Sequence, residues 1–108
     1  MKFKVHTTPN FEKEAKKLIK KYNSLKNEIS ILIDELKTNP VKGTHLGNNI
    51  YKIRIAIASK RKGKRSGARI ITQVRITHEI VYLFSIYNKG DKNNITNQEI
   101  ENIISSEL

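Results

Sequence analysis

Hydrophobic residues in the first forty positions recur at helical spacing. They form two amphipathic runs, residues 11–22 and 25–36, and lysines line the opposite side of the first run. Thr8 before Pro9 is a typical helix start, and Asn39 before Pro40 is a typical helix end. The pattern predicts a helical hairpin with a very short turn, preceded by a short strand over residues 2–6. The apolar positions of the hairpin are Phe11, Ala15, Leu18, Ile19, Tyr22, Leu25, Ile29, Leu32, Ile33 and Leu36.

After a loop rich in Gly, Thr and Asn, the hydrophobic spacing changes from 3.6 residues to two. Residues 51–58 and 68–76 alternate as half-buried strands do, and residues 80–87 are almost wholly apolar, as in a strand covered on both faces. We expect a loop at 60–66 and a tight hairpin turn at His78-Glu79. Thr96 and Glu99 have the spacing of a capping box and predict a last helix.

These elements make one α+β domain over residues 1–108, in the order β-α-α-β-β-β-α. We expect an N-terminal strand, a helical hairpin packed on a roughly four-stranded antiparallel sheet, and a short C-terminal helix. A chain of 108 residues leaves no room for a second core, and the absence of cysteine excludes thiolate chemistry and disulfides. No apolar run approaches the ~20 residues of a membrane helix, and the N-terminus has no signal-peptide core. The expectation is a cytoplasmic protein without a membrane partner.

Charge narrows the class of partner. Lys and Arg outnumber Asp and Glu by 21 to 10, and residues 36–78 contain no acidic residue at all. A net charge of +11 confined to one continuous segment favours a polyanionic partner, in the first place a nucleic acid. The helical stripes require the apolar face of the sheet, so the cations of the strands should lie on the opposite, exposed and concave face. These cations are Lys52, Arg54, Arg69 and Arg75.

Four stretches that cover most of the chain resemble the RelE/ParE superfamily of bacterial toxins, in particular its RelE/HigB-like mRNA interferases. They are residues 11–40, 47–54, 63–71 and 82–89, and they include Tyr-Lys-Ile-Arg at 51–54, Gly-Ala-Arg at 67–69 and a lysine just after the last strand. The resemblance implies the toxin of a type II toxin–antitoxin system, which cleaves mRNA in the ribosomal decoding site. It also implies neutralisation by a cognate antitoxin in a hetero-oligomer, and a reaction that needs no metal or cofactor.

RNA cleavage of this kind needs a base for the ribose 2′-hydroxyl, cations for the phosphorane and an acid for the leaving oxygen. By resemblance, Arg69 and Lys89 bind the phosphate and stabilise the transition state, while Lys52 or Arg54 contacts the backbone or transfers a proton. The three histidines fall at a strand end, in a loop and in a turn, and only His45 has a loop that could reach the basic face.

Other cations and one aromatic residue are candidates for RNA binding. The loop residues Lys60, Arg61, Lys62, Lys64 and Arg65 form either a solvated loop or an RNA-gripping arm, and Gly63 and Gly67 would let the backbone approach a phosphate near Lys64. Arg75 extends the basic face. Tyr87 is a base-stacking residue, a proton donor or a core aromatic. Residues 100–108 lack the tyrosine that some relatives carry there, which leaves the acid open.

Two alternatives share part of this evidence. A ParE-like toxin has the same fold but inhibits DNA gyrase without cleaving RNA. A non-catalytic basic domain would bind nucleic acid without affecting growth. For the interferase we expect an acidic antitoxin, and we expect an exposed Arg69 whose loss abolishes toxicity and leaves the fold intact.

Overall fold

The computed structural model describes residues 2–60, 66–92 and 94–107. Within these residues, three α-helices and five strands carry the fold. In chain order they are β1 (Lys4–Thr7), α1 (Pro9–Lys21), α2 (Leu25–Thr38), β2 (Thr44–His45), β3 (Ile50–Ile55), β4 (Ala68–Arg75), β5 (Ile80–Asn88) and α3 (Asn97–Glu107). The α+β class and the order of the main elements are as the hydrophobic pattern predicts. None of the described helices is long and apolar enough to cross a membrane.

The sheet is larger and more mixed than the sequence indicated. Its order is β1-β5-β4-β3-β2, so the short strand β2 adds a fifth member at one edge. β1 pairs with β5 in parallel, whereas the other neighbours are antiparallel. The expected tight turn is a 3₁₀ helix over Ile76–His78, followed by Glu79 in the left-handed region with φ 54°.

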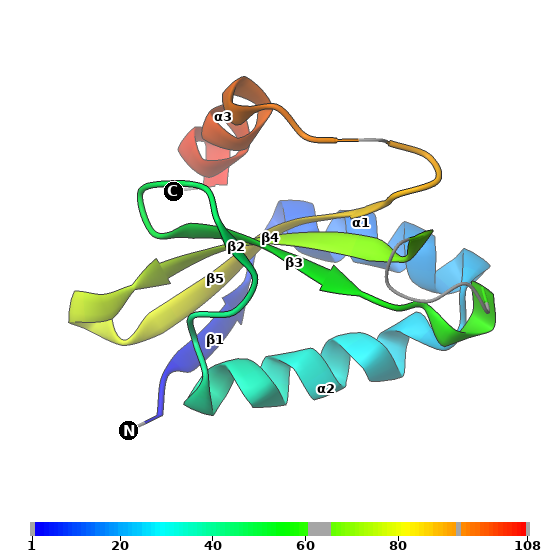
Figure 1. Ribbon diagram of the computed structural model, residues 1–108, viewed down its shortest axis with the longest axis horizontal. Coiled ribbons are helices and arrows are strands. Elements are labelled where there is room, and N and C mark those ends of the chain that lie inside the picture. The colour runs from blue at the N-terminus through cyan, green and yellow to red at the C-terminus, as the bar shows by residue number, and fades with distance from the viewer. Residues whose placement is uncertain (1, 61–65, 93, 108) are drawn as a thin grey trace.

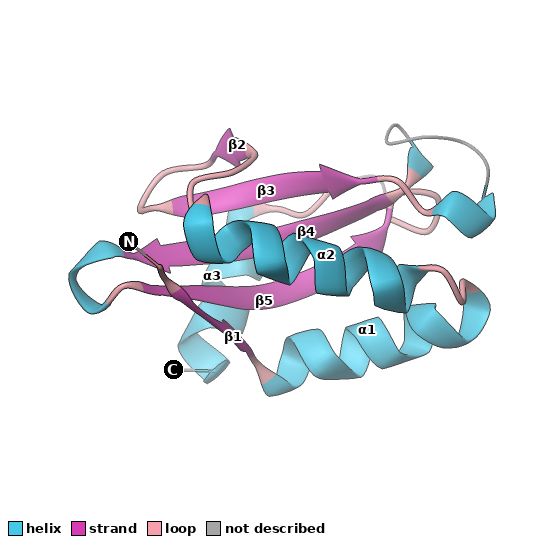
Figure 2. Ribbon diagram, turned by 90° about the horizontal axis from the view of Figure 1, so that it is seen from below, coloured by secondary structure: helices cyan, strands magenta, loops and turns pink. Residues whose placement is uncertain are grey.

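The helices cover both faces of the sheet. α1 and α2 lie on one face and α3 lies on the other (Figure 1, Figure 2). The main core fills the space between the helical hairpin and the sheet, and its members include Phe11, Leu25, Leu32, Leu36, Ile53, Ile70, Val81 and Leu83. A second, smaller core under α3 contains Ile50, Ile71, Tyr87, Ile95 and Ile100. The second face is therefore only partly open, which corrects the expectation of a fully exposed basic face.

The starts of α1 and α3 follow the capping rules, whereas Ser24 at the start of α2 makes no side-chain capping hydrogen bond. The Thr8 hydroxyl accepts a hydrogen bond from Phe11 N (3.2 Å), and Pro9 occupies the first turn of α1. At α3 the predicted capping box is formed: Glu99 N donates to Thr96 Oγ1 and Thr96 N donates to Glu99 Oε1, both at 3.1 Å. These caps place the helix starts where the sequence predicts them.

Thr72 of the central strand β4 offers a test of this packing. Its side-chain oxygen is fully buried, and it is the one such atom in the described part of the chain that lacks a hydrogen-bond partner. We expect Thr72→Val to raise the free energy of unfolding by about 1 kcal/mol, because a buried hydroxyl without a partner carries an uncompensated desolvation cost. Urea unfolding measures the change.

Thr8 provides the matched control. Its hydroxyl caps α1 and also donates to Leu83 O (3.1 Å), so Thr8→Val should lower the free energy of unfolding by about 1 kcal/mol. A loss of stability in Thr72→Val equal to that in Thr8→Val would contradict the assignment of Thr72 as unpartnered.

Candidate functional site

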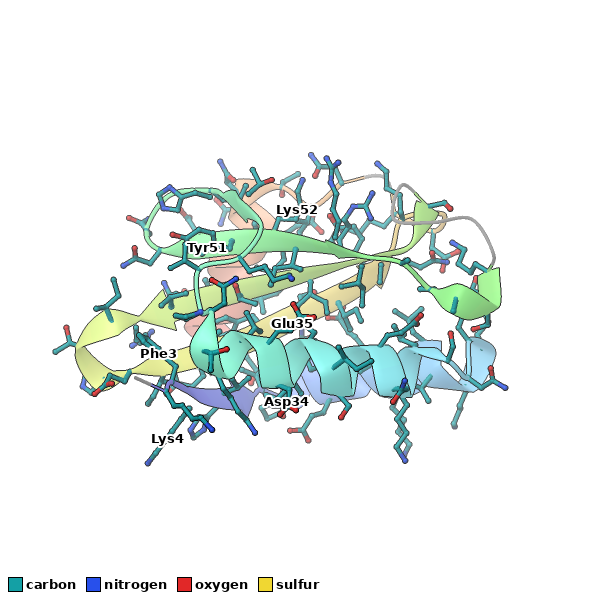
Figure 3. The ribbon with its side chains drawn as sticks, turned by 60° about the horizontal axis from the view of Figure 1, so that its bottom comes forward. Phe3, Lys4, Asp34, Glu35, Tyr51 and Lys52 are labelled. Carbon is teal, nitrogen blue, oxygen red and sulfur yellow. The ribbon has the colours of Figure 1, made fainter. Side chains whose placement is uncertain are left out.

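Cations from neighbouring strands meet on the α3 face of the sheet. In the register of β3 with β4, Arg54 lies directly opposite Arg69, and Arg69 in turn lies opposite Tyr87 of β5. Lys52 precedes Arg54 by two residues and therefore shares its side of β3. Figure 3 shows Lys52 on the side of β3 away from α2, whereas Tyr51 lies toward α2. We call Lys52, Arg54 and Arg69 the cationic row.

Arg54 and Arg69 form an electrostatically unfavourable pair. Like charges directly opposite on neighbouring strands destabilise a sheet. The first cause that lowers the pKa of Arg69 from its ordinary value is burial, and the second is the charge of Arg54, whereas Tyr87 acts in the opposite direction. A bound anion between the two guanidinium groups would relieve this repulsion. The arrangement is thus suited to a phosphate.

Arg69 is only 5% exposed, so the expectation of an exposed side chain is wrong. β3 and β5 flank Arg69 on either side of β4, and Arg69 Nη1 donates to the carbonyl of Ala68 at 3.2 Å. Enclosure fixes the guanidinium and strengthens its interaction with any charge that reaches it, because the surrounding dielectric is low. Replacement by alanine would also disturb packing.

Tyr87 is 7% exposed and belongs to the second core, in which it packs with Ile95 and Ile100. Burial raises the pKa of its phenol above the ordinary value, against the opposing charges of Arg69 and Lys92. The hydroxyl is therefore neutral at physiological pH. This placement is that of a core aromatic beside Arg69, and the covered ring presents no stacking face to a base.

Lys89 lies at the end of β5, close to the cationic row. Its backbone N–H donates to Gly67 O (3.0 Å), so the pairing with the start of β4 continues one residue past the strand. The side chain of Asn88 points to Tyr22 on the helical side, so strand alternation predicts the side chain of Lys89, the next residue, on the side of Tyr87. On the same face, Lys52 Nζ donates to Asn94 Oδ1 at 3.3 Å.

Two other predicted cations lie apart from the row. Arg75 stands six residues from Arg69 on β4, about 20 Å along the strand; it donates to Gln73 Oε1 (3.1 Å), with its guanidinium 5.5 Å from the centre of the Tyr82 ring. Lys60 is half-buried and hydrogen-bonded to Asn88. The remaining loop cations, Arg61, Lys62, Lys64 and Arg65, lie outside the described residues.

The histidines do not join the cationic row. His45 packs on Tyr51, with ring centres 5.0 Å apart, and therefore lies on the helical side of the sheet. His6 packs on Tyr82 near the β1 edge, and His78 lies in the distant 3₁₀ helix. Among residues 2–60, 66–92 and 94–107, no group of three His, Cys, Asp or Glu side chains could hold a metal ion.

Gly67 has a structural reason to be glycine that differs from the expected one. A Cβ atom at this position would lie 2.0 Å from Ile55 O, so the close approach is to the neighbouring strand β3 rather than to a ligand.

Two asparagines of this region, Asn88 and Asn94, were not predicted from the sequence, because nothing along the chain distinguishes them from its other asparagines. Only their contacts with Lys60 and Lys52 distinguish them.

Comparison with known proteins supports the fold and identifies the family. The family model described as the RelE toxin of the RelE/RelB toxin–antitoxin system matches residues 3–106. The chain belongs to this family of toxins. The RelE fold is also seen in the E. coli toxin RelE, in the structure of a mutant with two arginines replaced by alanine in the free state. That chain is 15% identical, with a TM-score of 0.61 and full coverage of both chains. No curated protein sequence matches the chain.

The raised pKa of Tyr87 gives a testable pH dependence. The folded state holds the phenolic proton of Tyr87 more tightly than the unfolded chain does, and this difference adds to the free energy of unfolding. The added stability is fully present below pH 10, the ordinary pKa of the phenol, and is lost as the pH rises through the higher pKa of the folded state. Tyr87→Phe should therefore lose less stability than the parent protein between pH 9 and pH 11. Parallel unfolding curves across that range provide the measurement, and identical pH slopes for the two proteins would refute it.

Proposed function

We propose that this member of the RelE toxin family is an endoribonuclease that cleaves mRNA on the ribosome and thereby stops translation. The observation that carries the proposal is the cationic row, in which Arg54 and Arg69 stand opposite each other with Lys52 and Lys89 nearby. A positive cluster of this kind fits the phosphodiester on which RNA cleavage takes place. Membership of the RelE toxin family also supports the proposal. The net charge of +11 suits a polyanionic substrate such as mRNA on the ribosome.

The reaction that these side chains could support is attack of the ribose 2′-oxygen on the adjacent phosphorus. The 2′-hydroxyl loses its proton as the new O–P bond forms, and the 5′-oxygen takes up a proton as its bond to phosphorus breaks. The products are a 2′,3′-cyclic phosphate and a 5′-hydroxyl. Arg69, fixed by burial, and Lys89 bind the phosphate and stabilise the charge of the phosphorane. Since arginine does not deprotonate in proteins, we assign proton transfer to Lys52 and contact with the RNA backbone to Arg54.

Mapping of mRNA 5′ ends on translating ribosomes tests the activity. Induction of the protein should stop growth and produce new 5′-hydroxyl ends inside ribosome-bound messages. Uncut transcripts together with DNA damage would instead indicate inhibition of gyrase. Normal growth after induction would indicate a basic domain that binds nucleic acid without catalysis, and either result would overturn the proposal.

We also infer a cognate antitoxin as the protein partner, which follows from the toxin family. The excess of positive charge in residues 36–78 favours an acidic partner that covers the basic face or displaces α3. Co-expression with the product of an adjacent small reading frame should restore growth and yield a stable complex. A product that neither binds the toxin nor protects the cell would contradict the pairing.

Arg54 separates function from stability more cleanly than Arg69 does, because its side chain is exposed. Arg54→Ala removes the repulsion across the strands, so the free energy of unfolding should stay constant or rise by up to about 0.5 kcal/mol. Cleavage should fall about 100-fold through the loss of one phosphate contact. Chemical unfolding and cleavage of ribosome-bound mRNA measure the two effects.

Lys20→Ala is the matched control, since Lys20 is an exposed cation on α1, on the other side of the sheet. Its cleavage rate should equal that of the parent protein. Equal losses in Arg54→Ala and Lys20→Ala would show that total charge, rather than the cationic row, determines activity.

A further inference from the structure

Lys60 has an unusual environment for a lysine at the edge of a basic loop. Its Nζ atom donates to Asn88 Oδ1 at 2.8 Å and to the carbonyl of Ser66, and it lies 5.5 Å from the centre of the Tyr22 ring. Two of the three N–H donors of a lysine are thereby used within the protein, and the ammonium is shielded by an aromatic face. The side chain joins the two ends of the loop to β5.

Asn88, the partner of Lys60, is 3% exposed and organises the turn that follows β5. Its Nδ2 donates to Tyr22 Oη (3.3 Å) and Asp91 Oδ2 (3.2 Å), and its Oδ1 also accepts from Gly90 N (3.3 Å). Its backbone carbonyl accepts from the N–H groups of Asp91 and Lys92 at 3.0 Å. The conformation of residues 88–92 therefore depends on Asn88, which in turn depends on Lys60.

This turn leads directly to the candidate site. Asn88 is paired with Ala68, the residue before Arg69, and it is followed by Lys89. A methyl group placed on Gly90 would lie 3.7 Å from both Lys60 Nζ and Asn88 Nδ2, so the turn packs directly against the pair. Loss of the Lys60–Asn88 contact would leave a buried amide oxygen with only a long hydrogen bond from Gly90 and would release the segment that carries Lys89.

We propose that Lys60 is a positioning residue, and that the Lys60–Asn88 pair holds Lys89 in place beside Arg69 for the reaction. The inference rests on the proposed nuclease function, and it reassigns Lys60 from the RNA-binding loop to the support of the site. A lysine that grips RNA keeps its ammonium available to phosphate, whereas this ammonium is bonded to the protein.

The test compares Lys60→Met with Asn88→Ala in cleavage of ribosome-bound mRNA. Both variants should lower kcat by roughly 10- to 100-fold through misplacement of Lys89, with KM nearly unchanged. The double variant should lose no more than Asn88→Ala alone, because that substitution already removes the side-chain partner of Lys60. Rates are expressed per folded molecule, well below each variant's Tm, so that a merely structural role would leave kcat unchanged.

Salt dependence distinguishes positioning from direct binding to RNA. A phosphate contact by Lys60 would make the slope of log affinity against log salt less negative by about one in Lys60→Met, with a raised KM. A positioning role leaves that slope unchanged, as does Asn88→Ala, which removes no charge. Lys20→Met, which removes a distant exposed cation, is the control for the loss of one positive charge. A changed slope with an unchanged kcat would overturn the inference.

A separate measurement keeps the inference independent of catalysis. In the free protein, Lys60→Met should shift the backbone amide resonances of residues 66–67 and 88–92 and leave those of α1 before Tyr22 in place. If the parent protein cleaves no mRNA, the proposed function fails while these shifts still test the pair. If the protein cleaves mRNA and these resonances do not move, the inference about Lys60 fails and the proposed function stands.

Discussion

The pairing of β3 with β4 is the constraint on which the site depends. The same register that puts Ile53 opposite Ile70 in the main core puts Arg54 opposite Arg69 on the other face. A slip of β3 by one residue would turn Lys52 and Arg54 toward the main core and Ile53 away from it, so hydrophobic burial holds Arg54 and Arg69 next to each other. The core thus maintains an arrangement that electrostatics alone would disperse.

The second face of the sheet serves two purposes at once. One part packs against α3 through Ile71, Tyr87 and Ile100, and the neighbouring part carries the cations. The ends of α3 are tied down by polar contacts: Lys92 pairs with Glu99 at its start, and near its end Glu107 Oε1 accepts from Asn10 N at the start of α1 (2.7 Å). The apolar cover fixes Tyr87 and thereby encloses Arg69, while Arg54 stays exposed.

Within the site, burial divides the cations by role. Arg69 and Lys60 are both held by hydrogen bonds to protein atoms, whereas Arg54 lies at the surface. A cation held by protein atoms has a fixed position, whereas an exposed cation is free to meet an approaching polyanion. This division explains why a count of positive residues in residues 36–78 indicates the class of partner but not the role of each residue.

The sequence by itself determined the order of elements, the helix caps and the faces of the strands, because each depends on spacing over a few residues. The alternation of Ile53 with Lys52 and Arg54, for example, required no knowledge of distant contacts. The family likeness carried by residues such as Arg69 was also readable along the chain and agrees with the RelE toxin family.

Tertiary structure alone decided the burial of Arg69 and Tyr87, the parallel pairing of β1, the placement of His45 on the helical side and the partnership of Lys60 with Asn88. Each of these joins segments far apart in the chain: Lys60 and Asn88, for instance, are separated by 28 positions. Local spacing carries no information about which distant backbone will cover a side chain, so burial and hydrogen-bond partners follow from the packing of the whole domain.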